Sequence, residues 1–130
     1  MKILLDTQCW LWMQASPDRF SPRVLELVKS PDNDLFLSAV SSWEIAIKYA
    51  LGKLPLPAPP AEYVPPRMAS SGVRALPVSH AHALQVAILP PHHRDPFDRL
   101  LVAQAQLERL PLLTSDRQLA AYDLEILWAT

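Results

Sequence analysis

Short runs of apolar residues that do not alternate with polar ones most constrain how this chain can fold. Ile3-Leu4-Leu5 is such a run, and Asp6-Thr7 close it. A strand that is apolar on both sides is covered on both faces, as at the centre of a parallel sheet. Comparable runs follow at Asp34–Ser38, Val73–Leu76, Leu112–Thr114 and Leu124–Leu127. The sequence therefore predicts five short strands.

Stretches with helical spacing separate these strands. They cover Ser21–Lys29, Ser41–Leu51 and Asp98–Leu110, and their apolar residues recur every three or four positions. Alternating strands and helices predict an α/β domain. Six of the 14 prolines fall within Pro55–Pro66, which predicts a loop leading into a short helix near Met68.

The composition predicts one domain over residues 1–130, since half of the residues are hydrophobic and a chain of this length buries one core. Twelve Lys and Arg balance thirteen Asp and Glu, so a nucleic-acid partner has to be held locally rather than by a basic field. The single cysteine, Cys9, excludes an internal disulfide. Because no signal-peptide or membrane-spanning stretch is evident, we expect a cytoplasmic protein that does not bind membranes.

Three of the acidic residues have ordinary structural interpretations. Glu44 follows Ser41 at the spacing of a capping box. Asp98 falls in the first turn of a helix that Asp95 caps, where its charge favours the helix dipole. Asp116 can cap the turn after a strand. Taken singly, each of these acids is more readily explained by a structural role than by a functional one.

Asp6 is harder to explain structurally, because a carboxylate at the end of a buried strand is costly unless it is paired or bound to a metal. Its structural alternative is to act as the N-cap of the helix that follows. Four acids follow strand ends or begin helices, and all are predicted to face the same edge of the sheet: Asp6, Glu44, Asp98 and Asp116. Like charges about 4 Å apart cost on the order of 4 kcal/mol at an effective dielectric near 20. A divalent cation removes that conflict, and oxygen ligands favour Mg²⁺ or Mn²⁺. Such a site predicts metal-assisted hydrolysis of a phosphodiester.

Four motifs give the chain a resemblance to the PIN domain, and specifically to VapC-type toxins of toxin–antitoxin pairs. They are Ile3–Thr7, Ser38–Ile45, His92–Ala105 with its distinctive HHRDPFDRLLVAQA, and Leu113–Asp116. The resemblance implies a Rossmann-like parallel sheet in the order 3-2-1-4-5 with helices on both faces. It also implies an endoribonuclease that binds Mg²⁺ or Mn²⁺ through the four acids, with Asp6 and Asp98 as the most direct contacts.

The same resemblance implies supporting roles and partners. The hydroxyls of Thr7 and Ser115 are expected to assist the acids. A cognate antitoxin is expected to lie across the cleft, and a homodimer is expected. Asp95 is interpreted as the helix cap rather than as a ligand. Because all four acids are present, nothing indicates an inactive copy.

Basic side chains near the acids are candidate RNA contacts, namely Lys48, Arg94 and Arg99. Two of them have a structural alternative: Lys48 can pair with Glu44 one helical turn earlier, and Arg99 can pair with Asp95. The four histidines have spacings that do not favour zinc, and we do not expect them to bind metal. Trp10, Trp12 and Trp43 are interpreted as core residues; the alternatives are stacking on bases or contact with apolar side chains of an antitoxin.

Other classes of protein fit less well. A phospho-accepting receiver domain needs a lysine late in the chain, but all four lysines precede residue 54. A haloacid-dehalogenase-like phosphatase needs an acid two residues after Asp6, where Gln8 stands. The alternative that stays open is a catalytically silent PIN-fold module that binds RNA or a protein partner without cleavage.

Overall fold

A computed structural model describes all residues from 1 to 130. Five parallel strands form one sheet in the order β3-β2-β1-β4-β5, which confirms the predicted topology. The strands are β1 (Lys2–Leu5), β2 (Asp34–Ser38), β3 (Arg74–Leu76), β4 (Leu112–Thr114) and β5 (Ile126–Trp128). The last strand begins at Ile126 rather than at Leu124, because Leu124 lies in a bend.

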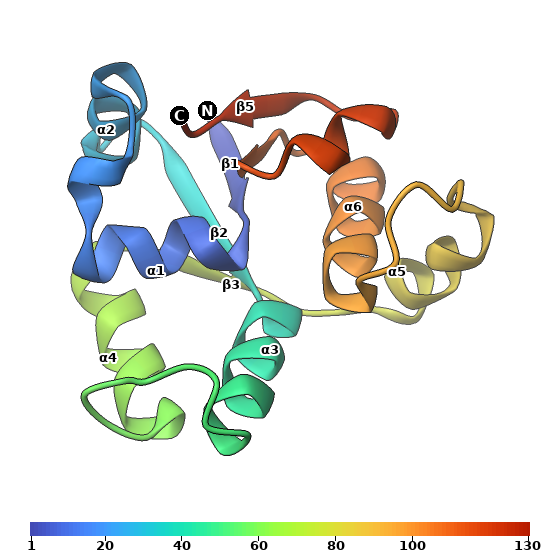
Figure 1. The fold of residues 1–130 in the computed structure, drawn as a ribbon. Coiled ribbons are helices and arrows are strands. Elements are labelled where there is room, and N and C mark those ends of the chain that lie inside the picture. Colours follow the sequence, from blue (N-terminus) through green and yellow to red (C-terminus); the bar gives the residue numbers. More distant parts are fainter.

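Helices cover both faces of this sheet. They are α1 (Thr7–Ala15), α2 (Pro22–Lys29), α3 (Ala39–Ala50), α4 (Pro60–Ser71), α5 (His80–Gln85) and α6 (Pro96–Glu108). Three short 3-10 turns complete the fold: η1 (Pro17–Arg19), η2 (Val86–Ile88) and η3 (Arg117–Ala121). In Figure 1, α1, α2 and α4 lie to one side of the sheet and α5 and α6 to the other.

Alternation along the buried strands divides the core into two layers. Ile3 and Leu5 belong to the cluster that includes Trp10 of α1, whereas Leu4 belongs to the cluster that includes Leu101 and Val102 of α6. Because successive side chains of a strand point to opposite faces, the unbroken apolar run of β1 serves both layers. All three residues of this run are fully buried.

The start of α3 differs from the predicted capping box. Ser38, the last residue of β2, is the N-cap, and its hydroxyl oxygen accepts a hydrogen bond from the amide of Val40 at 3.0 Å. The helix thus begins three residues earlier than a cap at Ser41 requires. Glu44 falls in the second turn and cannot reach back to a cap. The prediction that Ser41 caps this helix is therefore wrong.

The proline-rich segment also differs from expectation. Helix α4 runs from Pro60 to Ser71 and contains Pro65 and Pro66 in its interior. Each interior proline removes a helical hydrogen bond, but Tyr63 and Val64 are buried in the core. Burial of these apolar side chains offsets part of that loss, so the helix is longer than composition alone predicts.

The tryptophans divide between core and surface. Trp10 is fully buried and packs edge-on against Tyr63, as predicted. Trp43 is 57% exposed and packs on Phe97 at the start of α6. The interpretation of Trp43 as a core residue is wrong, because it lies on the outer side of α3 while its neighbour Glu44 turns inward.

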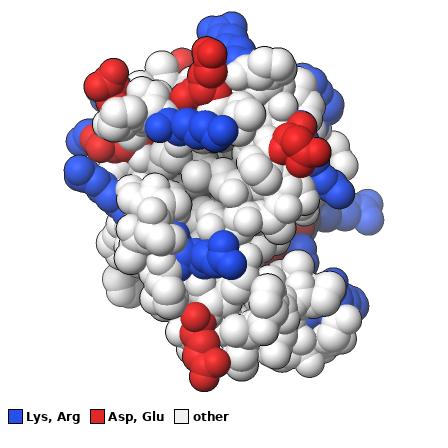
Figure 2. Space-filling model, turned by 90° about the vertical axis from the view of Figure 1, so that its left-hand side faces the viewer, with Lys and Arg blue, Asp and Glu red and all other residues white.

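None of the helices is both long enough and apolar enough to cross a membrane. The surface seen from the α1, α2 and α4 side carries separate basic and acidic side chains rather than one basic field (Figure 2). This distribution agrees with the near balance of charges in the chain.

Candidate active site

One pocket of about 370 Å³ is lined by all four predicted acids. Asp6 follows β1, Glu44 comes from α3, Asp98 from the first turn of α6, and Asp116 follows β4. The carboxyl ends of the central strands thus meet two helices at this point, as the parallel topology predicts. A larger hollow of about 570 Å³, beside Leu107 and Leu124, contains none of the predicted site residues.

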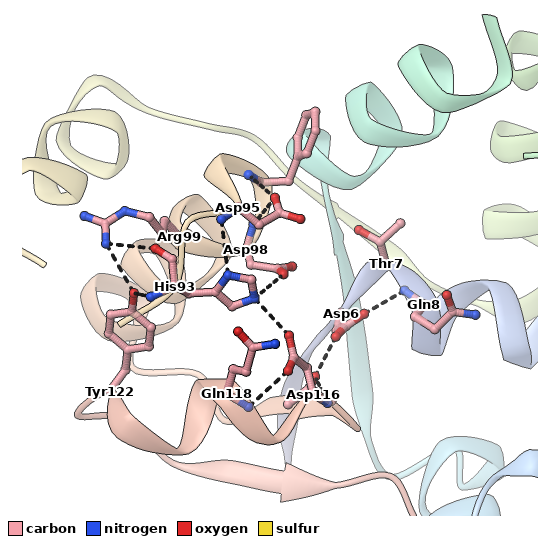
Figure 3. Close-up of polar contacts among 12 residues, drawn as sticks. Asp6, Thr7, Gln8, His93, Asp95, Asp98, Arg99, Asp116, Gln118 and Tyr122 are labelled. Atoms are coloured by element: carbon pink, nitrogen blue, oxygen red, sulfur yellow. Dashed lines mark hydrogen bonds and ion pairs between the residues drawn. The ribbon is translucent and has the colours of Figure 1, made fainter. Parts of the chain in front are cut away.

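Asp6 is only 7% exposed and accepts hydrogen bonds through both carboxylate oxygens. Its Oδ1 accepts from the amide of Gln8 at 2.6 Å, which makes Asp6 the N-cap of α1. Its Oδ2 accepts from the hydroxyl of Thr114 at 2.5 Å. Burial raises the pKa of Asp6, and these hydrogen bonds oppose that shift. The carboxylate is therefore both a helix cap and a wall of the pocket (Figure 3).

Glu44 is buried and held by partners on two sides. Its Oε1 lies 2.7 Å from the hydroxyl of Thr7, which itself lies 2.8 Å from the hydroxyl of Ser41. Because a hydroxyl has one hydrogen, Thr7 donates to Glu44 and accepts from Ser41. Lys48 pairs with the other oxygen of Glu44 one helical turn later, as predicted, and this hydrogen bond raises the pKa of Lys48. Thr7 thus supports an acid directly, by a hydrogen bond.

Asp98 and Asp116 lie closer to the surface and share a neighbour. The side chain of Asp98 is 18% exposed and that of Asp116 is 29% exposed. Nε2 of His93 lies 3.1 Å from Oδ2 of Asp98 and 3.0 Å from Oδ2 of Asp116 (Figure 3). Burial raises the pKa of Asp98 to about 7, and the charges of nearby acids, Asp95 first, add to the shift. Mutual repulsion among these acids favours a positive charge in the pocket.

Asp95 is the N-cap of α6, as predicted. Its Oδ1 accepts from the amides of Phe97 at 2.8 Å and of Asp98 at 3.3 Å. It lines the same pocket as the four acids, so its charge contributes to the local field. Pro96 occupies the first helical position, where the missing N–H has no cost.

The predicted RNA contacts fall in different surroundings. Lys48 lines the pocket, together with Lys53 and the predicted helper Ser115. Arg94 is exposed in the segment before α6. The guanidinium of Arg99 instead donates to Tyr122 and to carbonyls of the segment that precedes α6, those of Val86, Leu89, Pro90 and His93. These contacts give Arg99 a structural role and replace the expected pair with Asp95.

Three residues of the site were not anticipated from the sequence: Thr114, His93 and Lys53. Thr114 stands two residues before Asp116 in the Leu113–Asp116 motif. Its position at the end of a predicted strand could therefore have identified it as a residue of the site. His93 was considered only for zinc. Its contacts with Asp98 and Asp116 join distant segments, and local spacing does not report them.

The donor set fits a hard divalent cation. Five carboxylates line the pocket, those of Asp6, Glu44, Asp95, Asp98 and Asp116. Side-chain atoms of His93, Asp98 and Asp116 that are capable of metal ligation lie within 4.8 Å of one another. Oxygen-rich sites of this kind suit Mg²⁺ or Mn²⁺. Such an ion allows attack on a phosphoryl group by activating water and neutralising developing charge.

The chain is similar to known proteins in sequence as well as in fold. The family model of the PIN domain matches residues 3–125. Ribonuclease VapC16 of Mycobacterium tuberculosis is 55% identical over 56 residues. That match spans 43% of this chain and 40% of the relative, which is less than half of either protein.

Solved structures share the fold over nearly the whole chain. The DNA-bound VapBC2 structure from Rickettsia felis contains a chain with a TM-score of 0.69 and 15% identity, and the match covers 100% of both chains. The DNA-bound VapBC structure from Salmonella typhimurium gives 0.67 and 16%, covering 100% of this chain and 99% of the other. VapBC-5 from Mycobacterium tuberculosis, from a family of toxin–antitoxin systems, gives 0.59 and 20%, covering 98% and 96%. At these identities the likeness demonstrates the fold alone.

Proposed function

Because the chain belongs to the PIN domain family, we propose that it is a metal-dependent endoribonuclease and the toxin of a toxin–antitoxin pair. The observation that carries this proposal is the meeting of Asp6, Glu44, Asp98 and Asp116 in one pocket. The matched segment of a relative named as a ribonuclease supports RNA as the substrate. Several solved VapBC structures with this fold support an antitoxin as partner.

The four acids have different roles in metal binding in the proposed reaction. Asp6 and Asp98 bind Mg²⁺ or Mn²⁺ most directly, and Glu44 and Asp116 complete the ligand set. When bound, the ion supplies a more acidic water and neutralises charge on the phosphate. Thr7 keeps the carboxylate of Glu44 in place by its hydrogen bond. Ser115 lines the pocket, where its hydroxyl assists the acids.

Basic residues at the pocket position the RNA backbone in this proposal. Lys48 and Lys53 line the pocket, and Arg94 is exposed beside the α6 acids. A phosphate contact fixes the register of the chain without reading a base. Arg99 is assigned to the scaffold rather than to RNA because its donors already contact protein carbonyls and Tyr122.

The partners follow from the same assignment. We propose that a cognate antitoxin covers the acid pocket, that the toxin forms a homodimer, and that it acts in the cytoplasm. A free toxin that cleaves RNA harms its host, so an inhibitor that blocks the pocket is needed during growth.

The test uses purified protein that has been freed of any co-purified antitoxin. Incubation with total tRNA and rRNA is expected to produce discrete fragments in Mn²⁺ and none after chelation with EDTA. The Asp6→Asn protein is expected to leave the RNA intact under the same conditions. Expression in cells is expected to arrest growth for the natural chain and not for the Asp6→Asn variant.

A matched control shows that the effect of Asp6→Asn belongs to its place in the pocket and not to an Asp→Asn change in general. Asp123 is an exposed acid outside the acid pocket, so Asp123→Asn is expected to cleave as the natural chain does. Intact RNA with the natural chain in Mn²⁺, together with equal growth of cells that express the natural chain or the Asp6→Asn variant, contradicts the nuclease assignment. That result favours a PIN-fold module that binds without cleaving.

A further inference from the structure

His93 joins two acids that come from separate parts of the chain. Its Nε2 lies 3.1 Å from Asp98 on α6 and 3.0 Å from Asp116, which follows β4. The side chain is 13% exposed, so water competes little for these contacts. Figure 3 shows the ring between the two carboxylates. The arrangement makes His93 the one side chain that bridges the α6 acid and the β4 acid.

The other ring nitrogen determines which tautomer is present. Nδ1 of His93 lies 3.2 Å from the backbone nitrogen of Asp95, whose N–H can only donate. Nδ1 therefore accepts and carries no hydrogen, and in the neutral ring the hydrogen is on Nε2. This hydrogen is donated to Oδ2 of Asp116 at 3.0 Å, and Oδ2 of Asp98 lies 3.1 Å from the same nitrogen. A nitrogen that carries a hydrogen has no lone pair for a metal ion.

A second set of contacts holds the backbone of His93 in place. The amide of His93 donates to the hydroxyl of Tyr122 at 3.0 Å. Arg99 donates to the same hydroxyl at 3.2 Å and to the carbonyl of Pro90 at 2.9 Å. Tyr122 is buried. The segment before α6 is thus attached to the body of the protein on the side opposite the acids (Figure 3).

We propose that His93 is a positioning residue that holds Asp98 and Asp116 together for cation binding, because its Nε2 donates to Asp116 and lies against Asp98. His93 is then not itself a ligand. The cation is the one invoked in the proposed function, and the inference rests on that site. Donors that orient metal-binding carboxylates commonly change metal affinity by about 10–100-fold when they are removed. His93 occupies that place for the two more exposed acids.

Two substitutions separate the two nitrogens of the ring. In His93→Asn, the amide oxygen can replace Nδ1 as the acceptor for Asp95, but no donor reaches the acids. In His93→Gln, the longer amide can place a donor near the position of Nε2. We expect His93→Asn to weaken Mn²⁺ binding by about tenfold or more in calorimetry. His93→Gln is expected to lose clearly less affinity than His93→Asn.

The matched control is His80→Asn, since His80 is exposed at the start of α5 and does not line the acid pocket. It is expected to bind Mn²⁺ as the natural chain does. Thermal unfolding of each variant checks that the fold survives. If the folded Asn and Gln variants both bind Mn²⁺ as tightly as the natural chain, the positioning role is wrong.

Nitrogen NMR of the natural chain reports the tautomer directly. The expected spectrum has an unprotonated Nδ1 and a protonated Nε2 for His93, unchanged when Mg²⁺ is added. Loss of the Nε2 hydrogen on addition of Mg²⁺ makes His93 a ligand and overturns the proposal. Neither measurement uses RNA, so a chain that binds Mn²⁺ through His93-positioned acids yet leaves RNA intact refutes the nuclease function alone.

Discussion

The two sides of the acid pocket are built in different ways. Asp6 and Glu44 are buried, and each accepts a hydrogen bond from a threonine hydroxyl, Thr114 for Asp6 and Thr7 for Glu44. Asp98 and Asp116 are partly exposed and share the ring of His93. We refer to the first pair as the inner acids and to the second pair as the outer acids.

This difference determines how far each pair depends on protein donors, although both pairs line the proposed cation site. Buried carboxylates are costly without donors, so the inner acids depend on the surrounding hydroxyls. The outer acids retain more contact with water and can exchange it for an ion. We therefore expect loss of the hydroxyl donors around the inner acids to lower stability. Substitution of an outer acid is expected to lower cation binding and activity with little loss of stability.

The largest expected effect comes from removing an outer acid. Asp98→Asn is expected to lower RNA cleavage by about 100-fold or more, since a metal ion contributes several kcal/mol to such a reaction. The free energy of unfolding is expected to change by no more than about 1 kcal/mol, because Asn removes a repelled charge without removing a cap. Cleavage rates and urea denaturation measure the two quantities. If Asp98→Asn cleaves RNA as fast as the natural chain does, Asp98 has only a structural role.

The next largest effect is the loss of stability when the metal ion is removed. Mn²⁺ at about 100 times its dissociation constant is expected to stabilise the natural chain by about 2.7 kcal/mol over the EDTA-treated protein. If Asp98→Asn weakens binding tenfold, the same concentration stabilises that variant by only about 1.4 kcal/mol. Differential scanning calorimetry with and without Mn²⁺ measures both. Equal stabilisation of the two proteins removes Asp98 from the ligand set.

For the inner acids, the expected effect of removing a hydroxyl donor is a loss of stability. Thr114→Val removes the hydroxyl that donates to Asp6 and accepts from the amide of Asp116. Leaving a buried carboxylate without its donor costs about 1–3 kcal/mol, so urea denaturation is expected to show a loss of that size. Thr114→Ser keeps the hydroxyl and is the matched control. A variant as stable as the natural chain contradicts the idea that the fold depends on the inner acids' donors.

The sequence predicted the parts of this site that depend on local chemistry. The apolar run before Asp6 predicted a central strand, and Asp95-Pro96 predicted the start of α6; both are confirmed. The order of the strands came from the family resemblance, since spacing alone does not determine which strands are neighbours. The four acids were placed at one edge, and they line one pocket.

The errors arose where distant contacts outweigh local preference. Ser38 and Ser41 can each cap a helix, and only the end of β2 decides in favour of Ser38. Pro65 and Pro66 disfavour a helix locally, but burial of their neighbours maintains it. The role of His93 depends on Asp116, 23 residues later. No pattern within one element carries that information.

The smallest expected effect tests whether Glu44 relies on its lysine or on its threonine. Lys48 is 43% exposed, and its pair with Glu44 spans one helical turn. Such pairs contribute about 0.2–0.5 kcal/mol and are screened by salt. Lys48→Met is therefore expected to lower the free energy of unfolding by a few tenths of a kcal/mol at low salt and by less at high salt.

Lys53→Met is the matched control, because Lys53 lines the same pocket without an ion pair. Urea denaturation at both salt concentrations measures the difference between the two variants. A loss above about 1 kcal/mol for Lys48→Met exceeds what an exposed pair provides. That outcome means that Lys48, and not Thr7, is the main partner that stabilises the buried carboxylate of Glu44. The inner acids are then not distinguished from the outer acids by their hydroxyl donors.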